Sequence, residues 1–219
     1  DLLALRQRLS RLFMQCLSRA LPLRVSVTGQ APQQPMLWVS NHVSWLDIPL
    51  LGMLAPLSFL SKAEVRDWPL LGWLADQAGT LFIQRGAHQC TEVNQQLREY
   101  LQQDRHLLLF PEGSTSDGSA LRTFHPRLLA SAIDSGVALQ PVAIRYRRNG
   151  ERCQLSPFID DDDLLSHLLR LLSSEAVCVE IQLLSPISSE SASRNQLARQ
   201  ARESIAQALY GVAPNGQPA

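Results

Sequence analysis

The chain has 219 residues, 45% of them hydrophobic, so it is long enough to bury a substantial core within a single domain. Its 20 basic and 20 acidic residues cancel, and the absence of a basic excess argues against nucleic-acid binding. Its four cysteines, Cys16, Cys90, Cys153 and Cys178, form no Cys-x-x-Cys pair, which favours reduced structural thiols over a zinc site or a disulfide framework.

The first segment in chain order, residues 1–23, is predicted to form a basic amphipathic helix. Leucines recur along it between arginines, and the arginines up to residue 24 are Arg6, Arg8, Arg11, Arg19 and Arg24. Such a helix can lie on an anionic membrane surface or pack on the domain with its arginines in water, and the sequence leaves both readings open. No stretch of the chain reaches the roughly 20 apolar residues needed to span a bilayer.

Residues 24–210 alternate predicted strands and helices. The predicted strands are residues 24–28, 36–40, 58–61, 80–84, 107–110, 139–146 and 177–184. The predicted helices are residues 47–54, 64–77, 90–103, 127–135, 164–172 and 195–210. This alternation predicts one α/β domain with a central, largely parallel (mixed) sheet flanked by helices. Residues 211–219 contain two glycines and two prolines and are predicted to form a flexible tail.

An imidazole and a carboxylate follow the predicted strand at residues 36–40. A neutral imidazole such as that of His42 can take a proton near neutral pH, and a carboxylate on its other nitrogen, such as that of Asp47, fixes the tautomer. Proline is tolerated in the first turn of a helix, so Pro49 indicates that a helix starts near Asp47 and that His42 precedes it. The alternative is that Asp47 only caps this helix and His42 is a loop residue.

Two more predicted strands end in residues suited to binding anions. The strand at 107–110 stops at Pro111 and enters the polar turn Glu112-Gly113-Ser114-Thr115, whose N–H groups and hydroxyls can face an anion or an acyl oxygen. The strand at 80–84 ends at Arg85, whose planar fork can donate two hydrogen bonds to a phosphate or carboxylate. Ordinary turn chemistry and a solvated arginine are the competing explanations.

Four ordered blocks between residues 25 and 146 carry a family resemblance. They are Asn-His-Val-Ser-Trp-Leu-Asp at 41–47, Gly-Thr-Leu-Phe-Ile-Gln-Arg-Gly at 79–86, Phe-Pro-Glu-Gly-Ser at 110–114 and Gln-Pro-Val-Ala-Ile at 140–144. Together they resemble the glycerolipid acyltransferase family typified by 1-acylglycerol-3-phosphate acyltransferase. The resemblance implies that the His42 imidazole is the general base and that the Asp47 carboxylate orients it. It further implies that Arg85 and the Glu112–Thr115 turn hold the acceptor, and that Pro141 lies beside the site.

One departure from the family pattern bears on the acceptor. The family's commonest third block has arginine after Glu-Gly-Thr, whereas this chain has Thr115 there, so a phosphate clamp would lose one charged contact. Arg122 and Arg127 are the downstream candidates to replace it. Residues 115–118, 140–146 and 161–165 look more like the branch that contains lyso-ornithine lipid acyltransferases.

The resemblance implies an O-acyltransferase of lipid metabolism that moves a fatty acyl chain from acyl-CoA or acyl carrier protein to a lysolipid, with no metal or other cofactor. Lysophosphatidic acid ranks first as the acceptor because it is the family's commonest substrate, and lyso-ornithine lipid ranks second because of the missing arginine. We expect a location at the cytoplasmic face of the inner membrane, either peripheral or anchored by a segment upstream of Asp1.

Other classes of function and site have weaker support. A non-catalytic membrane-lipid binding protein would not need the intact pair of His42 and Asp47. A serine esterase would need a Gly-x-Ser-x-Gly elbow, which Ser114 lacks. The aspartates at 160–163 could form a cation site, but they more simply cap the helix that follows them.

Overall fold

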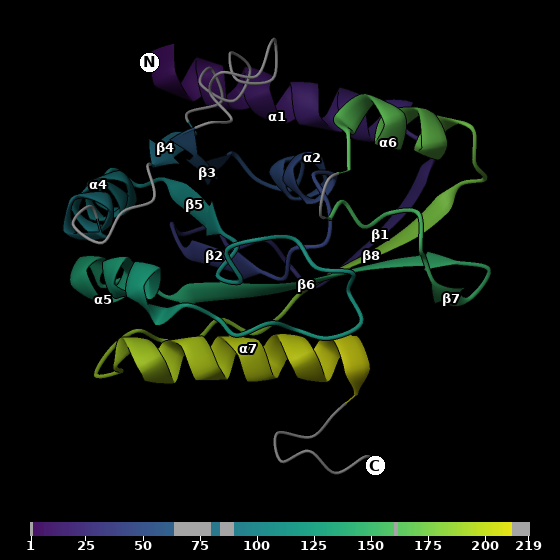
Figure 1. The fold of residues 1–219 in the computed structure, drawn as a ribbon. Helices are drawn as coiled ribbons and strands as arrows, with labels where there is room; N and C mark the ends of the chain where they lie inside the picture. Colours follow the sequence, from purple (N-terminus) through teal and green to yellow (C-terminus); the bar gives the residue numbers. More distant parts are fainter. Residues whose placement is uncertain (1, 64–79, 84–89, 160–161, 212–219) are drawn as a thin grey trace.

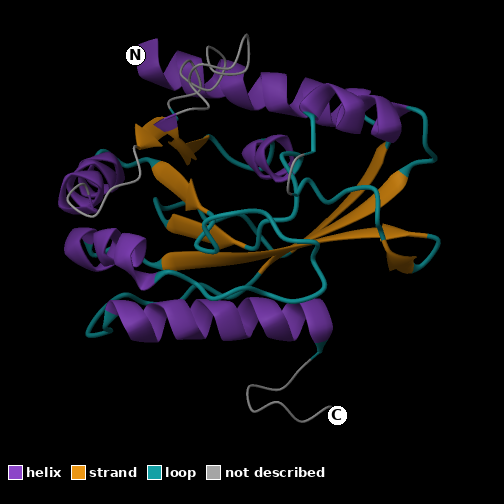
Figure 2. Ribbon diagram, viewed as in Figure 1, coloured by secondary structure: helices purple, strands orange, loops and turns teal. Residues whose placement is uncertain are grey.

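The structure is a computed structural model that describes residues 2–63, 80–83, 90–159 and 162–211. A single sheet runs through it (Figures 1 and 2), with strand order β1-β8-β6-β2-β5-β3-β4 and β7 paired to β6. The strands are β1 (Leu23–Thr28), β2 (Leu37–Ser40), β3 (Leu57–Lys62), β4 (Leu81–Ile83), β5 (His106–Leu109), β6 (Leu139–Arg148), β7 (Glu151–Arg152) and β8 (Val177–Leu183).

The run from β6 to β4 is parallel, and β8 pairs antiparallel to β6, so the sheet is mixed and mostly parallel, as predicted. The predicted strands agree with the observed ones within about two residues. The two-residue strand β7, which closes a hairpin with β6, was not predicted because it is too short to show a strand pattern.

Helices cover both faces of the sheet (Figure 1). They are α1 (Leu2–Ala20), α2 (Asp47–Gly52), α4 (Cys90–Gln102), the 3₁₀ helix η2 (Pro126–Leu129), α5 (Ala130–Ser135), α6 (Leu164–Leu172) and α7 (Arg194–Tyr210). The predicted helix at 127–135 is therefore split, with a 3₁₀ turn that has proline near its N-terminus. The predicted helix at 64–77 lies outside the described residues.

Two hydrophobic clusters lie on the opposite faces of the sheet. Leu17 of α1, Leu50 of α2 and Leu171 of α6 pack in one cluster with Trp38 of β2. Residues of α4, α5 and α7 pack in the other cluster with Leu37 and Val39 of β2. Because successive side chains of a strand point to opposite faces, the short apolar strand β2 serves both clusters and is fully buried.

The topology brings the first and third sequence blocks together. β2 and β5 are adjacent and parallel, so their carboxyl ends meet at the same edge of the sheet, where open α/β sheets place ligands. Figure 1 shows the loops after both strands at this edge. None of the helices that the structure describes has the length and apolar character needed to cross a bilayer.

Candidate active site

His42 and Asp47 form a hydrogen-bonded pair in the loop between β2 and α2. The Nδ1 atom of His42 lies 2.8 Å from Oδ2 of Asp47, whose carboxylate is fully buried, whereas the imidazole is 17% exposed. Because a carboxylate only accepts hydrogen bonds, Nδ1 carries the proton and Nε2 is left with a lone pair. The predicted pairing is confirmed, and it leaves Nε2 able to take a proton.

The same carboxylate also shapes the loop. Oδ2 of Asp47 accepts hydrogen bonds from the backbone N–H of Val43 at 2.7 Å and of Ser44 at 3.0 Å. As predicted, His42 precedes the helix, which begins at Asp47. Asp47 therefore both holds the loop and orients the imidazole. The helix-capping alternative is wrong, because Leu46 is the N-cap residue of α2 and no side chain caps the helix there.

Tyr146 is part of the site although no sequence motif singled it out. Its hydroxyl donates a hydrogen bond to Oδ1 of Asp47 at 2.5 Å, and its side chain is buried. Burial and the neighbouring Asp47 carboxylate raise the pKa of the Tyr146 hydroxyl well above its usual value, so it stays a donor. The available signal was its position in the same strand as the fourth block, two residues after Ile144 and on the same face.

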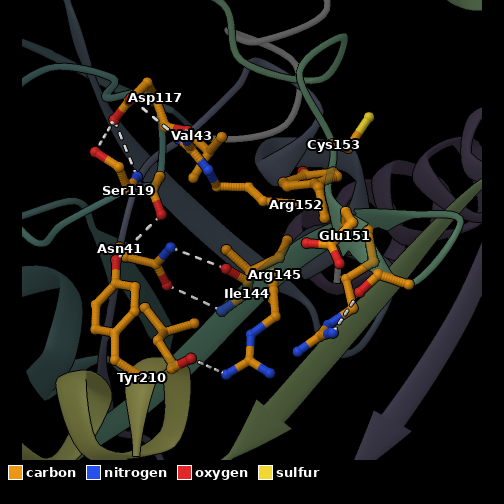
Figure 3. A pocket seen from close by; sticks show the side chains of 15 residues that line it. Asn41, Val43, Asp117, Ser119, Ile144, Arg145, Glu151, Arg152, Cys153 and Tyr210 are labelled. Atoms are coloured by element: carbon orange, nitrogen blue, oxygen red, sulfur yellow. Dashed lines mark hydrogen bonds and ion pairs between the residues drawn. The ribbon is translucent and has the colours of Figure 1, made fainter. Parts of the chain in front are cut away.

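Two further contacts fix the loop between β2 and α2, residues 41–46, which we call the catalytic loop. The ring of Phe110, directly after β5, stacks on the His42 imidazole with centroids 3.8 Å apart and an interplanar angle of 11°. The side chain of Asn41 accepts from the backbone N–H of Ile144 and donates to its carbonyl, both at 2.9 Å (Figure 3). The loop is thus fastened to the ends of both β5 and β6.

Glu112 joins the catalytic loop to the segment that follows the polar turn. Its two carboxylate oxygens accept from the backbone N–H of His42 at 2.8 Å and of Arg122 at 2.9 Å. Burial raises the pKa of the Glu112 carboxyl above its usual value. This geometry gives Glu112 a structural role, and its predicted contact with the acceptor stays a prediction.

The polar turn and Ser116, the residue after it, lie beside the catalytic loop. The N–H of Ser116 donates to the carbonyl of His42 at 2.9 Å, and Gly113 has a φ of +76°, which favours glycine. Ser114 accepts a hydrogen bond from Nη1 of Arg122 at 2.6 Å, while Thr115 is half-buried. Of the two arginines considered as replacements, Arg122 is therefore the one that reaches this turn.

The remaining predicted residues are placed as follows. Arg85 lies outside the described residues, so its predicted contact with the acceptor stays a prediction. Pro141 pairs with Val39 in the sheet, three residues before Ile144. Asp163 caps α6, because its side chain accepts from the N–H of Ser166 at 2.8 Å, which confirms the capping role.

Two hollows border the segment at residues 116–119. One, of about 310 Å³, is lined by Asn41, Val43, the end of β6, β7 and the end of α7 (Figure 3). Asp117 borders it and pairs with Arg152 at 3.0 Å; hydrogen bonds from Ser119, and then from Arg152, lower the pKa of the Asp117 carboxyl to about 2.

The second hollow, of about 380 Å³, is lined by Ser116, Asp117, Ser119, Ala120, Arg122 and Ile159. It places a guanidinium and an ionised carboxylate next to the segment that is hydrogen-bonded to the carbonyl of His42.

Comparisons with known proteins agree with this geometry. Residues 23–145 match the family model described as Acyltransferase. The chain is 61% identical over 213 residues to a lyso-ornithine lipid O-acyltransferase of Pseudomonas aeruginosa, covering 97% of this chain and 83% of that protein. It is 35% identical over 190 residues to a 1-acyl-sn-glycerol-3-phosphate acyltransferase of Neisseria gonorrhoeae, covering 85% of this chain and 74% of that one.

Among solved structures, the crystal structure of the 1-acyl-sn-glycerophosphate acyltransferase PlsC from Thermotoga maritima superposes with a TM-score of 0.72. The two chains are 21% identical, and the superposition covers 97% of this chain and 81% of that one. At this level of identity the match shows a shared fold.

Proposed function

The chain belongs to the acyltransferase family typified by 1-acylglycerol-3-phosphate acyltransferase, and on this premise we propose that it is an enzyme of lipid biosynthesis that acylates the free hydroxyl of lyso-ornithine lipid. The observation that carries the proposal is the 61% identity, over 97% of the chain, to a protein of that name. The histidine and the aspartate of the family's first block, His42 and Asp47, are both present, and their side chains are hydrogen-bonded to each other.

The reaction follows from the geometry of the pair. Nε2 of His42 takes the proton of the acceptor hydroxyl as its oxygen attacks the carbonyl carbon of an acyl thioester. The carbon–sulfur bond breaks, the acyl chain stays on the acceptor oxygen, and the proton passes from the imidazole to the leaving thiolate. The Asp47 carboxylate stabilises the imidazolium that forms in between. Neither a metal nor a covalent acyl-enzyme takes part.

The acceptor order differs from the expectation based on sequence, which ranked lysophosphatidic acid first. An ornithine head group carries both a carboxylate and an ammonium. Arg122 lines the second hollow and suits the carboxylate, whereas Asp117, which also lines it, already pairs with Arg152. Thr115 also stands where a phosphate-binding arginine is usual in the family. These features favour a head group with a carboxylate over a phosphate.

Lysophosphatidic acid is the second candidate acceptor. Relatives at 35% identity carry the name of that activity, and the guanidinium of Arg122 also suits a phosphate. The donor is the acyl thioester of coenzyme A or of acyl carrier protein. The enzyme acts at the membrane face where its acceptor lies.

A two-donor assay tests the proposal. The purified chain is incubated in detergent with labelled acyl-CoA or acyl carrier protein and a panel of lysolipids, and the products are resolved by mass. We expect the highest kcat/KM with lyso-ornithine lipid. A higher kcat/KM with lysophosphatidic acid would reverse the order of acceptors, and no transfer to any lysolipid would overturn the proposed activity.

A further inference from the structure

Two helices on one face of the sheet expose leucines at the same spacing. On α1, Leu5, Leu9 and Leu12 are more than half exposed, and on α6, Leu165, Leu169 and Leu172 are more than half exposed. Residues spaced by four and then three positions fall on one side of a helix. We call these two sets the α1 ridge and the α6 ridge.

Exposed large hydrophobic side chains are not spread evenly over the two faces of the sheet. Among the described residues, the large hydrophobic side chains classed as exposed are those of the two ridges, Phe13 of α1, Val27 of β1 and Tyr210 at the end of α7. α1 and α6 both pack on the cluster that contains α2, and Figure 1 draws these helices above the sheet and α7 below it. The exposed apolar surface is therefore concentrated on one side of the molecule.

The inner side of α6 holds the catalytic loop. Nε1 of Trp45, within the first block, donates a hydrogen bond to Nδ1 of His167 at 3.0 Å, and His167 is fully buried. In the segment that leads to α6, the N–H of Phe158 donates to the carbonyl of Val43 at 3.0 Å. The α6 ridge thus lies on the outer side of the helix that contacts the loop of His42.

The inner side of α1 holds the helix that begins at Asp47. Nε of Arg11 and the side-chain amide of Gln15 both donate to the carbonyl of Met53, at 3.0 and 3.3 Å, at the end of α2. Both helices with a ridge therefore contact the unit formed by the catalytic loop and α2.

The arginines beside the α1 ridge indicate a partner with negative charge. At about 100° per residue, Arg8 and Arg19 fall on one side of the ridge and Arg6 on the other. All three are exposed. Leucines flanked by arginines suit the boundary between lipid head groups and acyl chains, where the guanidinium groups meet anionic head groups.

We infer that the α1 and α6 ridges together form a docking surface for an anionic lipid bilayer, and that docking brings the catalytic loop to the lipid surface. The α6 ridge is the new element, since nothing in the sequence indicated lipid contact by this helix. The inference rests on the proposed function in one respect: the acceptor is a lipid that the enzyme must reach in a bilayer.

The test compares serine and methionine substitutions in the α6 ridge. The double variant Leu165→Ser with Leu169→Ser removes apolar surface, while Leu165→Met with Leu169→Met keeps it at the same positions. Co-sedimentation of the full chain with phosphatidylcholine vesicles that contain phosphatidylglycerol measures binding. We expect the serine variant to bind about tenfold or more weakly, because binding scales with buried apolar area, and the methionine variant to bind like the parent.

Activity in two environments separates this inference from the proposed function. We expect the serine variant to lose transfer to lysolipid in vesicles and to keep parental transfer in detergent, which also shows that it is folded. Parental vesicle binding by the folded serine variant would overturn the inference. So would a parental dimer that the serine change splits without altering vesicle binding, since the ridge would then face a second copy. No transfer in detergent by the parent would instead overturn the proposed function.

Discussion

The hydroxyl of Tyr146 donates a 2.5 Å hydrogen bond to the carboxylate of Asp47, 99 residues earlier in the chain. It occupies Oδ1, while His42 and the loop amides share Oδ2. All of these contacts donate hydrogen bonds to the carboxylate and together fix its orientation. The proposed general base, His42, therefore depends on β6 as well as on its own loop.

Replacing Tyr146 with phenylalanine should lower kcat and leave KM for both substrates nearly unchanged. The variant removes a donor from a fully buried carboxylate, which should also reduce the free energy of unfolding by about 1–3 kcal/mol. Steady-state kinetics and urea unfolding measure the two effects. An unchanged kcat in Tyr146→Phe would show that Asp47 is oriented without it.

Glu112→Gln should destabilise the protein more than a surface substitution does. Both carboxylate oxygens accept backbone N–H groups, so the amide nitrogen of glutamine would face a donor and leave a buried N–H unpaired. We expect a loss of about 1–3 kcal/mol in the free energy of unfolding. Arg98→Gln, at an exposed position of α4, serves as the control. Equal stability of the two variants would contradict the structural role of Glu112.

Arg122→Ala should raise KM for the acceptor far more than KM for the acyl donor, because the guanidinium faces the polar turn and the second hollow. Thr115→Arg should shift selectivity toward lysophosphatidic acid by adding a second fork for phosphate. Kinetics with each substrate varied in turn measure both changes. Equal changes in the two KM values would show that Arg122 maintains the loop rather than reading the head group.

The stability of the protein should carry a pH dependence that comes from His167. Burial, and then the charge of Arg170, lower the pKa of His167 below its ordinary 6.5, while Asp162 opposes the shift. As the pH falls below 6.5, His167 therefore takes up a proton in the unfolded chain before it does so in the folded chain. The stabilising effect of neutral His167 is complete above that pH and is lost as the pH falls from there toward the lowered pKa.

His167→Gln should remove this part of the pH dependence, since the glutamine oxygen can still accept from Trp45 but does not titrate. Urea unfolding of both proteins on either side of the transition measures the difference, and the other histidines cancel in the comparison. Identical pH dependence in wild type and variant would show that His167 does not titrate differently in the folded state.

The strands and the catalytic pair could be predicted because each depends on local pattern. Short apolar runs such as residues 37–40 and 107–109 predict buried strands, and Pro49 places the start of α2. The first and third blocks carry their chemistry within a few residues of a strand end. Adjacent parallel strands then bring them together without further information from the sequence.

The contacts that could not be predicted depend on how distant segments pack. Tyr146 reaches Asp47 through the register of β6 against β2. From the sequence, Arg122 and Arg127 are equal candidates to replace the missing arginine. In the structure, Glu112 accepts from the backbone N–H of Arg122, and the guanidinium of Arg202 donates to the carbonyl of Arg122 at 3.0 Å. Such contacts are set by tertiary packing, so even the strand pattern that gives the face of Tyr146 does not identify its partner.

The most direct test of the central claim is acyl transfer by His42→Ala, assayed in detergent with the best donor and acceptor of the parent. Because we propose the imidazole as the general base, its loss should reduce kcat by about 10²–10⁴-fold, while circular dichroism and thermal unfolding show an intact fold. Asp47→Asn should lower kcat in the same direction, because the imidazole loses the carboxylate that stabilises its protonated form. Parental turnover in a folded His42→Ala protein would contradict the mechanism.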